Sequence, residues 1–448
     1  MEDRPVRGLE LCLFGVVALT LIVGALIGSG GGGKDNASKS DGRAGSAGSG
    51  TKGVDVRRIM RRVEHLRSLR FRRRLAVTFA SRAQASRLLS SEARPRYASR
   101  RARVDEEELK LIGLLPPSTS LEKTLDTVDK EQVLGFYDEH SKRLVVIREQ
   151  AANRALLEIT LAHELDHALD DQHFGLHASP RLDDDETIAQ DSLFEGTATV
   201  VMTDYASRYL GFVDLLGVLG SLAGTGAKPP KFIEDSLLFP YDAGEQFVLA
   251  IRERGWRRDG SPVRGWKAVN HAFRRRPRST EQVLHPEKYV SGEHGGRVGI
   301  PPLQARLGAG WRRLDATSIG EFDLRELFSV VGRERSSRAA TGWNGGAFEL
   351  WRRNVAAISS CSSPCIDRDL AVVRLAWDSG RDRREGEAAL RRVFERGLRG
   401  RLVSLRGGVG WWSSRGGAIL MAGGSNQSDV VFAPDAGLGA KLLLGLVR

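Results

Sequence analysis

Hydrophobic and polar residues repeat along the chain with helical or strand-like periods, and these periods predict most of its elements. In the first half they predict a helix near 54–68, a short helix that ends at Leu89, and helices over 105–114, 155–172 and 187–209. They also predict strands over 75–79, 133–137 and 143–147. A five-residue polar loop separates the last two strands and predicts a hairpin. The second strand then leads through Asn153 into the long helix at 155–172.

The composition of the chain changes after residue 295: Gly, Arg and Trp become more frequent, and the apolar runs become shorter. This change predicts a separate α+β module over 296–448, after a first folded domain over 54–295. Within the module we expect helices near 319–331 and 385–394, and strands over 370–377, 402–405, 417–421 and 430–432. The segment GGAFELW is a candidate for an edge strand.

The N-terminal region has the pattern of a membrane anchor. Residues 11–27 carry no charge and are just long enough to cross a bilayer as a helix, after the basic residues Arg4 and Arg7. We expect an uncleaved transmembrane helix within 1–28, with a cleaved signal peptide as the alternative. A Gly- and Ser-rich linker over 29–53 follows. The flanking charges do not decide the topology, and we expect a single-pass membrane protein with its folded part outside the cytoplasm.

Composition excludes several classes of protein. The chain has 448 residues, with 28% charged and 41% hydrophobic side chains, which excludes wholesale disorder and a many-pass membrane protein. Its net charge of +12 comes mostly from scattered arginines, with a concentration over 57–103 that favours a solvated basic face. Few aromatic residues lie among these arginines, so we expect no nucleic-acid partner.

The three cysteines are too few for a disulfide scaffold. Cys361 and Cys365 stand in a CxxxC pattern, which is compatible with a small disulfide loop or with two reduced thiols.

The strongest chemical signal is ITLAHELDHALDDQHF, which places His163, Glu164 and His167 in an HExxH pattern. On a helix, residues four apart lie about 40° apart around the axis. Both imidazoles therefore project from one face and can bind the same metal ion. Glu164 lies about 100° from His163, beside the ion, where it would take a proton from a zinc-bound water.

A hydrolytic zinc site needs a third protein ligand, and two residues compete for that role. His173 has the spacing of a metzincin ligand, but Asp170 stands where that arrangement needs a helix-breaking glycine. On an unbroken helix His173 points about 240° away from His167. Glu195, in LFEGTATVV on the next long helix, is therefore favoured. The acidic run 183–186 and Asp191 stay open as further candidates.

Four segments, GFYDEHSKRLVV, TLAHELDHALDDQHF, LFEGTATVVM and RSTEQVLHPEKY, resemble an uncharacterised group of bacterial gluzincin-type zinc metallopeptidases, often membrane-anchored or secreted. The resemblance is strong over 54–289 and weaker beyond. It implies an α+β, zincin-like metallopeptidase fold that holds Zn²⁺ through His163, His167 and Glu195, with Glu164 as the general base.

The chain departs from that group at Asp170 and Thr197, where the group usually has Gln and Asp. These departures put in doubt the groups that orient the imidazoles, and Asp171 is our candidate for that task, with a solvent-facing charge as the equal alternative. The resemblance also implies that an extended peptide pairs with a strand of the predicted hairpin. Downstream, His285 is the first candidate for an oxyanion donor, ahead of Lys288 and Tyr289.

The sequence thus predicts a membrane-anchored zinc metallopeptidase that acts on a peptide or protein substrate, with Glu164 and His285 as catalytic residues. The alternative is a scaffold or binding protein at the membrane that keeps the fold without hydrolysis. The presence of Glu164 favours the enzyme, because a scaffold does not need the base.

Overall fold

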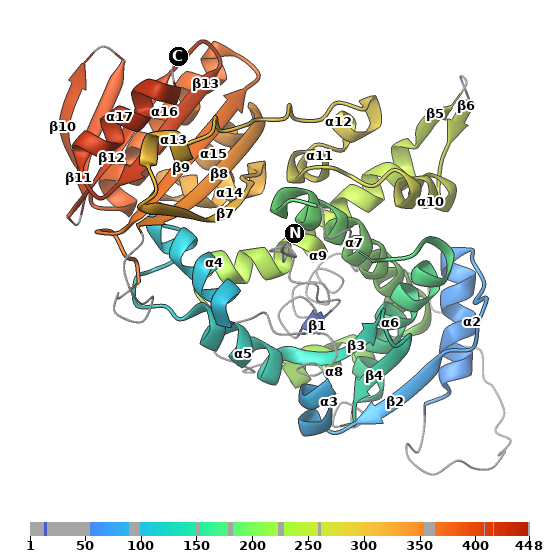
Figure 1. The fold of residues 1–448 in the computed structure, drawn as a ribbon. Coiled ribbons are helices and arrows are strands. Elements are labelled where there is room, and N and C mark those ends of the chain that lie inside the picture. The colour runs from blue at the N-terminus through green and yellow to red at the C-terminus, as the bar shows by residue number, and fades with distance from the viewer. Residues whose placement is uncertain are drawn as a thin grey trace, which may run out of the picture.

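The computed structural model describes residues 13–15, 54–88, 99–148, 153–177, 182–222, 228–258, 261–353, 363–406, 408–414 and 416–446. It combines helices with two main sheets (Figure 1). A helix-rich part surrounds a small sheet, and a second part is built on a large sheet near the C-terminus.

The small sheet carries the predicted hairpin. Its strands are β1 (Leu13–Gly15), β2 (Ala76–Ala80), β3 (Val133–Asp138) and β4 (Arg143–Ile147), in the order β1-β3-β4-β2. β3 and β4 are antiparallel, with Gly135 opposite Val146, and β2 is parallel to β4. Lys142 takes a left-handed conformation with a φ of 57° at the end of the loop that joins β3 to β4.

Helices pack around this sheet and form the larger share of the N-terminal part. They are α2 (Val56–Arg67), α3 (Arg82–Leu88), α4 (Ser99–Ile112), α5 (Leu121–Gln132), α6 (Arg154–Phe174), α7 (Asp184–Tyr209), α8 (Phe212–Leu222), α9 (Lys231–Arg254), α10 (Trp266–Arg274), α11 (Thr280–Leu284) and α12 (Pro286–Ser291). A two-stranded ribbon of β5 (Trp256–Arg258) and β6 (Ser261–Val263) follows α9. One core joins α2, α6, α7 and the small sheet, and a second joins α7, α9 and α10.

The predicted transmembrane helix is wrong for the part of 11–27 that the structure describes. Leu13–Gly15 form strand β1, which pairs antiparallel with β3 so that Leu13 lies opposite Phe136. Among all the described residues, no helix is both long and apolar enough to span a bilayer. An apolar run without polar periodicity is equally compatible with a buried strand, which the sequence pattern did not distinguish from a helix. The predicted linker over 29–53 lies outside the described residues.

The C-terminal part is built on a seven-stranded sheet in which every neighbouring pair is antiparallel. The strand order is β10-β11-β12-β13-β9-β8-β7. The bounds are β7 Trp311–Ser318, β8 Trp343–Arg353, β9 Asp369–Trp377, β10 Arg401–Arg406, β11 Val409–Ser414, β12 Gly417–Gly423 and β13 Gln427–Ala433. The GGAFELW segment belongs to β8, which lies inside the sheet between β7 and β9 rather than at its edge.

Helices cover both faces of the large sheet, because its central strands are apolar on both sides. In β9, Leu370 and Val372 belong to one core, while Val373 and Leu375 belong to another. The first face packs against α13 (Gln304–Leu307) and α17 (Ala436–Leu446), and the second against α14 (Glu321–Leu327), the 3₁₀ helix Phe328–Val331, α15 (Arg333–Ala340), α16 (Gly380–Arg392) and the π-helical turn Val393–Gly397.

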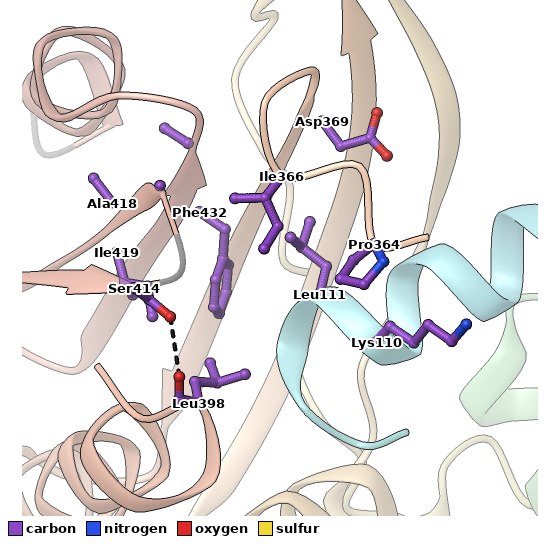
Figure 2. A pocket seen from close by; sticks show the side chains of 12 residues that line it. Lys110, Leu111, Pro364, Ile366, Asp369, Leu398, Ser414, Ala418, Ile419 and Phe432 are labelled. Carbon is purple, nitrogen blue, oxygen red and sulfur yellow. Dashed lines mark hydrogen bonds between the residues drawn. The ribbon is translucent and has the colours of Figure 1, made fainter. Parts of the chain in front are cut away.

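Helix α4 packs on this C-terminal part, from which it is distant in sequence. Leu111 and Ile112 belong to the core of the large sheet, and Glu107 accepts a hydrogen bond from the Cys365 backbone N–H. Figure 2 shows Leu111 beside Pro364 and Ile366, at a small cavity of about 40 Å³. Cys365 is disulfide-bonded, and Cys361 lies outside the described residues.

Candidate metal centre

The HExxH segment lies in the middle of α6, a 21-residue helix. The Asn153 side chain caps its N-terminus by accepting from the Leu156 N–H at 3.0 Å, and Gly175 ends it with a φ of 68°. Most of the helix surface is buried, because α6 has α2, α7 and β3 as neighbours. His163 and His167 are 0% and 1% exposed, so a rigid and enclosed helix positions both imidazoles.

Three side-chain atoms meet in a nearly equilateral triangle beside α6. The Nε2 atoms of His163 and His167 are 3.1 Å apart. The Oε2 atom of Glu195, from α7, lies 3.1 Å from the first and 3.3 Å from the second. Glu195 is therefore the predicted ligand that the fold brings to the two histidines.

The triangle fits a zinc ion by distance and by donor type. Zinc in proteins is bound tetrahedrally at about 2.0–2.2 Å by imidazole nitrogen and carboxylate oxygen, so its ligand atoms lie about 3.3 Å apart. The observed edges of 3.1–3.3 Å are close to that value. Three protein donors leave a fourth tetrahedral position, which is the arrangement of a catalytic rather than a structural zinc site.

Glu195 reaches this position because α7 and α9 cross in backbone contact next to it. A Cβ atom added to Gly196 would lie 2.2 Å from the carbonyl carbon and oxygen of Gly244, and one added to Gly244 would lie 2.2 Å from the Ser192 carbonyl oxygen. Only glycines allow so close an approach. The glycine that follows Glu195 in LFEGTATVV is thus explained by helix packing.

Glu164 is fully buried beside the ligands, and among the described residues its carboxylate accepts no short hydrogen bond, although the Tyr137 backbone N–H lies near enough to lower its pKa. Burial raises its pKa to about 8, with Glu195 adding to the rise and His167 opposing it. A buried carboxylate with so few partners costs free energy, and groups with such perturbed pKa values cluster at functional sites. Strand β3 approaches the same carboxylate: a Cβ atom on Gly135 would lie 3.7 Å from Glu164 Cγ.

The charges of the three ligand residues depend on one another. Burial lowers the pKa of His163 to about 4. For His167, burial lowers the pKa, but the charge and hydrogen bond of Glu195 together with the charges of Glu164 and Asp166 outweigh it, and the result is about 9. For Glu195, burial raises the pKa, but the charges of His167 and His163 together with their hydrogen bonds outweigh it, and the result is about 2. The proton on His167 thus supplies the positive charge that balances Glu195, and a divalent cation would take over this role.

The other candidates for the third ligand lie elsewhere. His173 is near the end of α6, where its Nε2 is 2.8 Å from the Arg70 carbonyl oxygen. In the acidic run, Asp183 accepts from the Glu186 N–H at 2.9 Å as the N-cap of α7. Asp185 accepts from the Thr280 hydroxyl at 2.6 Å. These contacts serve helix capping and packing.

The contacts of Asp171 join α6 to the hairpin and not to the imidazoles. Its Oδ2 accepts from the Tyr137 hydroxyl at 2.8 Å and from Lys142 Nζ at 2.7 Å. Thr197, at the other departure from the group, donates to the Leu193 carbonyl at 2.7 Å within its own helix. Asp171 therefore fixes β3 against α6.

His285 lies at the junction of α11 and α12, against α14 of the C-terminal part. Its Nε2 is 3.1 Å from Glu321 Oε1, and its Nδ1 is 3.6 Å from Glu287 Oε1. Lys288 forms an ion pair with Glu281 at 2.7 Å, and the Tyr289 hydroxyl donates to the Arg275 carbonyl at 2.7 Å. None of these three predicted residues has a described contact with His163, His167 or Glu195.

Two neighbours of the site carried no signal in the sequence. Tyr241 of α9 stacks on His163, with ring centroids 6.0 Å apart and an angle of 23° between the rings. Arg67 of α2 is fully buried behind α6, with Nη2 2.9 Å from Asp170 and Nε 3.6 Å from Asp166. Arg67 thus accounts for the charge at position 170. A buried arginine partner is not visible from local pattern.

Comparison with known proteins covers only the C-terminal part. Residues 306–441 match the family described as a domain of unknown function (DUF8575), which spans most of the large sheet and its helices. No curated protein matches the chain. No solved structure matches it either.

Proposed function

We propose that this protein is a zinc-dependent metallopeptidase whose metal ion is held by His163, His167 and Glu195. The triangle of donor atoms with edges of 3.1–3.3 Å carries the proposal, since its size and composition suit tetrahedral zinc with one open position. The buried carboxylate of Glu164 beside the three donors supports an enzyme over a scaffold, because a structural metal site does not need a general base.

A zinc ion in this place would act as a Lewis acid on a peptide carbonyl and lower the pKa of a water molecule. Glu164 would accept the proton of the attacking water and then pass it to the leaving amine. Tyr241 packs on the His163 ring and limits its rotation. Because the ligands and Glu164 are almost fully buried, a substrate reaches them only when a covering element moves.

The substrate would bind as an extended peptide along β3. This strand runs past Glu164, and its backbone groups suit strand addition. Strand β3 pairs with β4 on one side and with β1 (Leu13–Gly15) on the other, where Phe14 lies opposite Gly135. A peptide would therefore take the position of β1, and β1 would have to leave first.

The full-length chain with Glu164→Gln tests the mechanism. Gln keeps the size of the side chain but accepts no proton, so the variant should bind one zinc ion and keep its unfolding free energy while losing hydrolysis of an unstructured protein such as casein. Removal of a general base costs about 10²–10⁴ in rate. Equal activity of wild type and variant would refute this role of Glu164.

Metal content tests the ligand set independently of the substrate. Wild type should carry one tightly bound zinc ion per chain, measured by elemental analysis after dialysis. Glu195→Ala should reduce that content sharply, whereas His173→Ala should leave it unchanged, because His173 contacts the Arg70 carbonyl instead. Retention of zinc in Glu195→Ala with loss in His173→Ala would overturn the assignment.

A further inference from the structure

A second group of metal-binding side chains lies on the surface, at the far end of α6. Glu139 and His140 come from the β3–β4 loop, and His177 follows α6. One potential ligand atom from each lies within 4.8 Å of the others. His177 Nδ1 is 3.2 Å from Glu139 Oε1, and the two imidazoles stack with centroids 5.3 Å apart and 17° between their planes.

The hairpin loop is held in shape by its own hydrogen bonds. Asp138 accepts from the His140 N–H at 2.9 Å and from the Ser141 N–H at 3.3 Å, which fixes the backbone that carries Glu139 and His140. The hairpin is in turn tied to α6, since Tyr137 and Lys142 both donate to Asp171. The backbone that carries both loop residues of the group is therefore positioned before any ligand arrives.

The segment with His177 is held just as firmly. The Leu176 N–H donates to Asp171 Oδ1 at 3.3 Å, and the Leu176 side chain is buried in the core of α7 and α9. Arg276 donates to the carbonyl oxygens of Gly175 and His177, the latter at 3.2 Å. Asp171 thus contacts both segments that supply the group.

We propose that Glu139, His140 and His177 form a second binding site for a divalent transition-metal ion such as zinc. Two imidazoles and one carboxylate are a typical ligand set for zinc, nickel or copper, and solvent would complete the coordination. The negative charges of Asp138 and Glu139 favour a cation, while Arg276, which attracts Glu139, opposes it. The site is separate from the buried triangle and does not depend on the proposed hydrolysis.

This surface site should be the weaker of the two. Its donor atoms spread over as much as 4.8 Å, against edges of 3.1–3.3 Å in the buried triangle. The His177 side chain is 52% exposed and the Glu139 side chain 23%, so both would lose rotational freedom on closing around an ion. Bound metal would tie the hairpin loop to the end of α6 and so stabilise the frame around β3.

Zinc titration of the full-length chain by isothermal calorimetry, after one equivalent has filled any tight site, tests the proposal. Wild type should bind one further equivalent. His140→Ala and His177→Ala should each weaken that event by about tenfold or more, since loss of a residue that merely orients a ligand already costs 10- to 100-fold. His294→Ala is the matched control, an exposed histidine outside the group, and should bind as wild type does.

A double variant, His163→Ala with His167→Ala, separates this proposal from the proposed function. It should lose the tight event and still bind one zinc ion weakly, and added zinc should still raise its melting temperature. A folded double variant that binds no zinc ion would overturn the surface site. An unchanged affinity of the weaker zinc site in both His140→Ala and His177→Ala would overturn it as well.

Discussion

The crossing of α7 and α9 makes a quantitative prediction about Gly244. A Cβ atom at position 244 would lie 2.2 Å from the Ser192 carbonyl oxygen, whereas ordinary contacts begin at 3.4 Å. Gly244→Ala therefore forces the two helices apart by roughly 1 Å at this point. Because Glu195 lies on α7 beside the crossing, the same displacement moves its carboxylate away from His163 and His167.

The expected cost follows from overpacking. An added methyl group that must shift backbone in a tight core destabilises a protein by about 1–3 kcal/mol. Alanine regains about 1 kcal/mol through its better helix propensity, so the net loss should be about 0–2 kcal/mol. Zinc affinity should fall as well, because a site about 1 Å too wide no longer fits tetrahedral ligands at their normal distance.

Two measurements check this prediction: urea unfolding monitored by circular dichroism, and zinc affinity by competition with a chelator. Gly310→Ala is the control, because a Cβ atom there meets no atom within 4 Å. Gly196→Ala should behave like Gly244→Ala, and the double variant should cost less than the sum, since one displacement relieves both clashes. If Gly244→Ala kept wild-type stability and zinc affinity, the backbone contact would not be what positions Glu195.

Three further predictions concern the surroundings of the site and the C-terminal part. Arg67→Met should destabilise the fold by about 3–5 kcal/mol in urea unfolding, because it leaves Asp166 and Asp170 buried without a cation; a loss under 1 kcal/mol would contradict the ion-pair reading. Burial raises the pKa of Glu107 from 4.5 to about 7. Between these two pH values the folded state binds more protons than the unfolded state, so the free energy of unfolding falls as the pH rises from 4.5 to about 7. Glu107→Gln should flatten that slope between pH 5 and pH 8, and an unchanged slope would assign it to other groups. Removal of residues 1–53 should raise casein hydrolysis several-fold, because β3 loses its pairing with Leu13–Gly15, whereas an unchanged rate would show that β1 does not compete with substrate.

Local pattern was enough for several of the elements and for two of the three proposed ligands. The HExxH spacing alone puts His163 and His167 on one face of a helix, because helical geometry depends on local sequence only. The same geometry argued against His173 and left Glu195 as the favoured partner. The hairpin before α6 also follows from alternation and a polar loop, and the structure has it at 133–138 and 143–147.

Local pattern was not enough where the partner of a residue is distant in sequence. The apolar run 11–27 has no periodicity that distinguishes a strand from a helix. Leu13–Gly15 form a strand because they pair with the backbone of β3, which is distant in sequence. Likewise, α4 packs on the large sheet, and GGAFELW is an interior strand, because the buried surface is completed by elements remote in the chain.

What the sequence by itself determined is the chemistry on α6: two imidazoles and a carboxylate at helical spacing. The tertiary structure alone decided the rest. It brought Glu195 within 3.3 Å of both imidazoles through the glycine crossing, placed Arg67 behind Asp170, and directed Asp171 to the hairpin rather than to an imidazole. The physical reason is that spacing along one helix sets which side chains share a face, whereas packing between helices sets what that face meets.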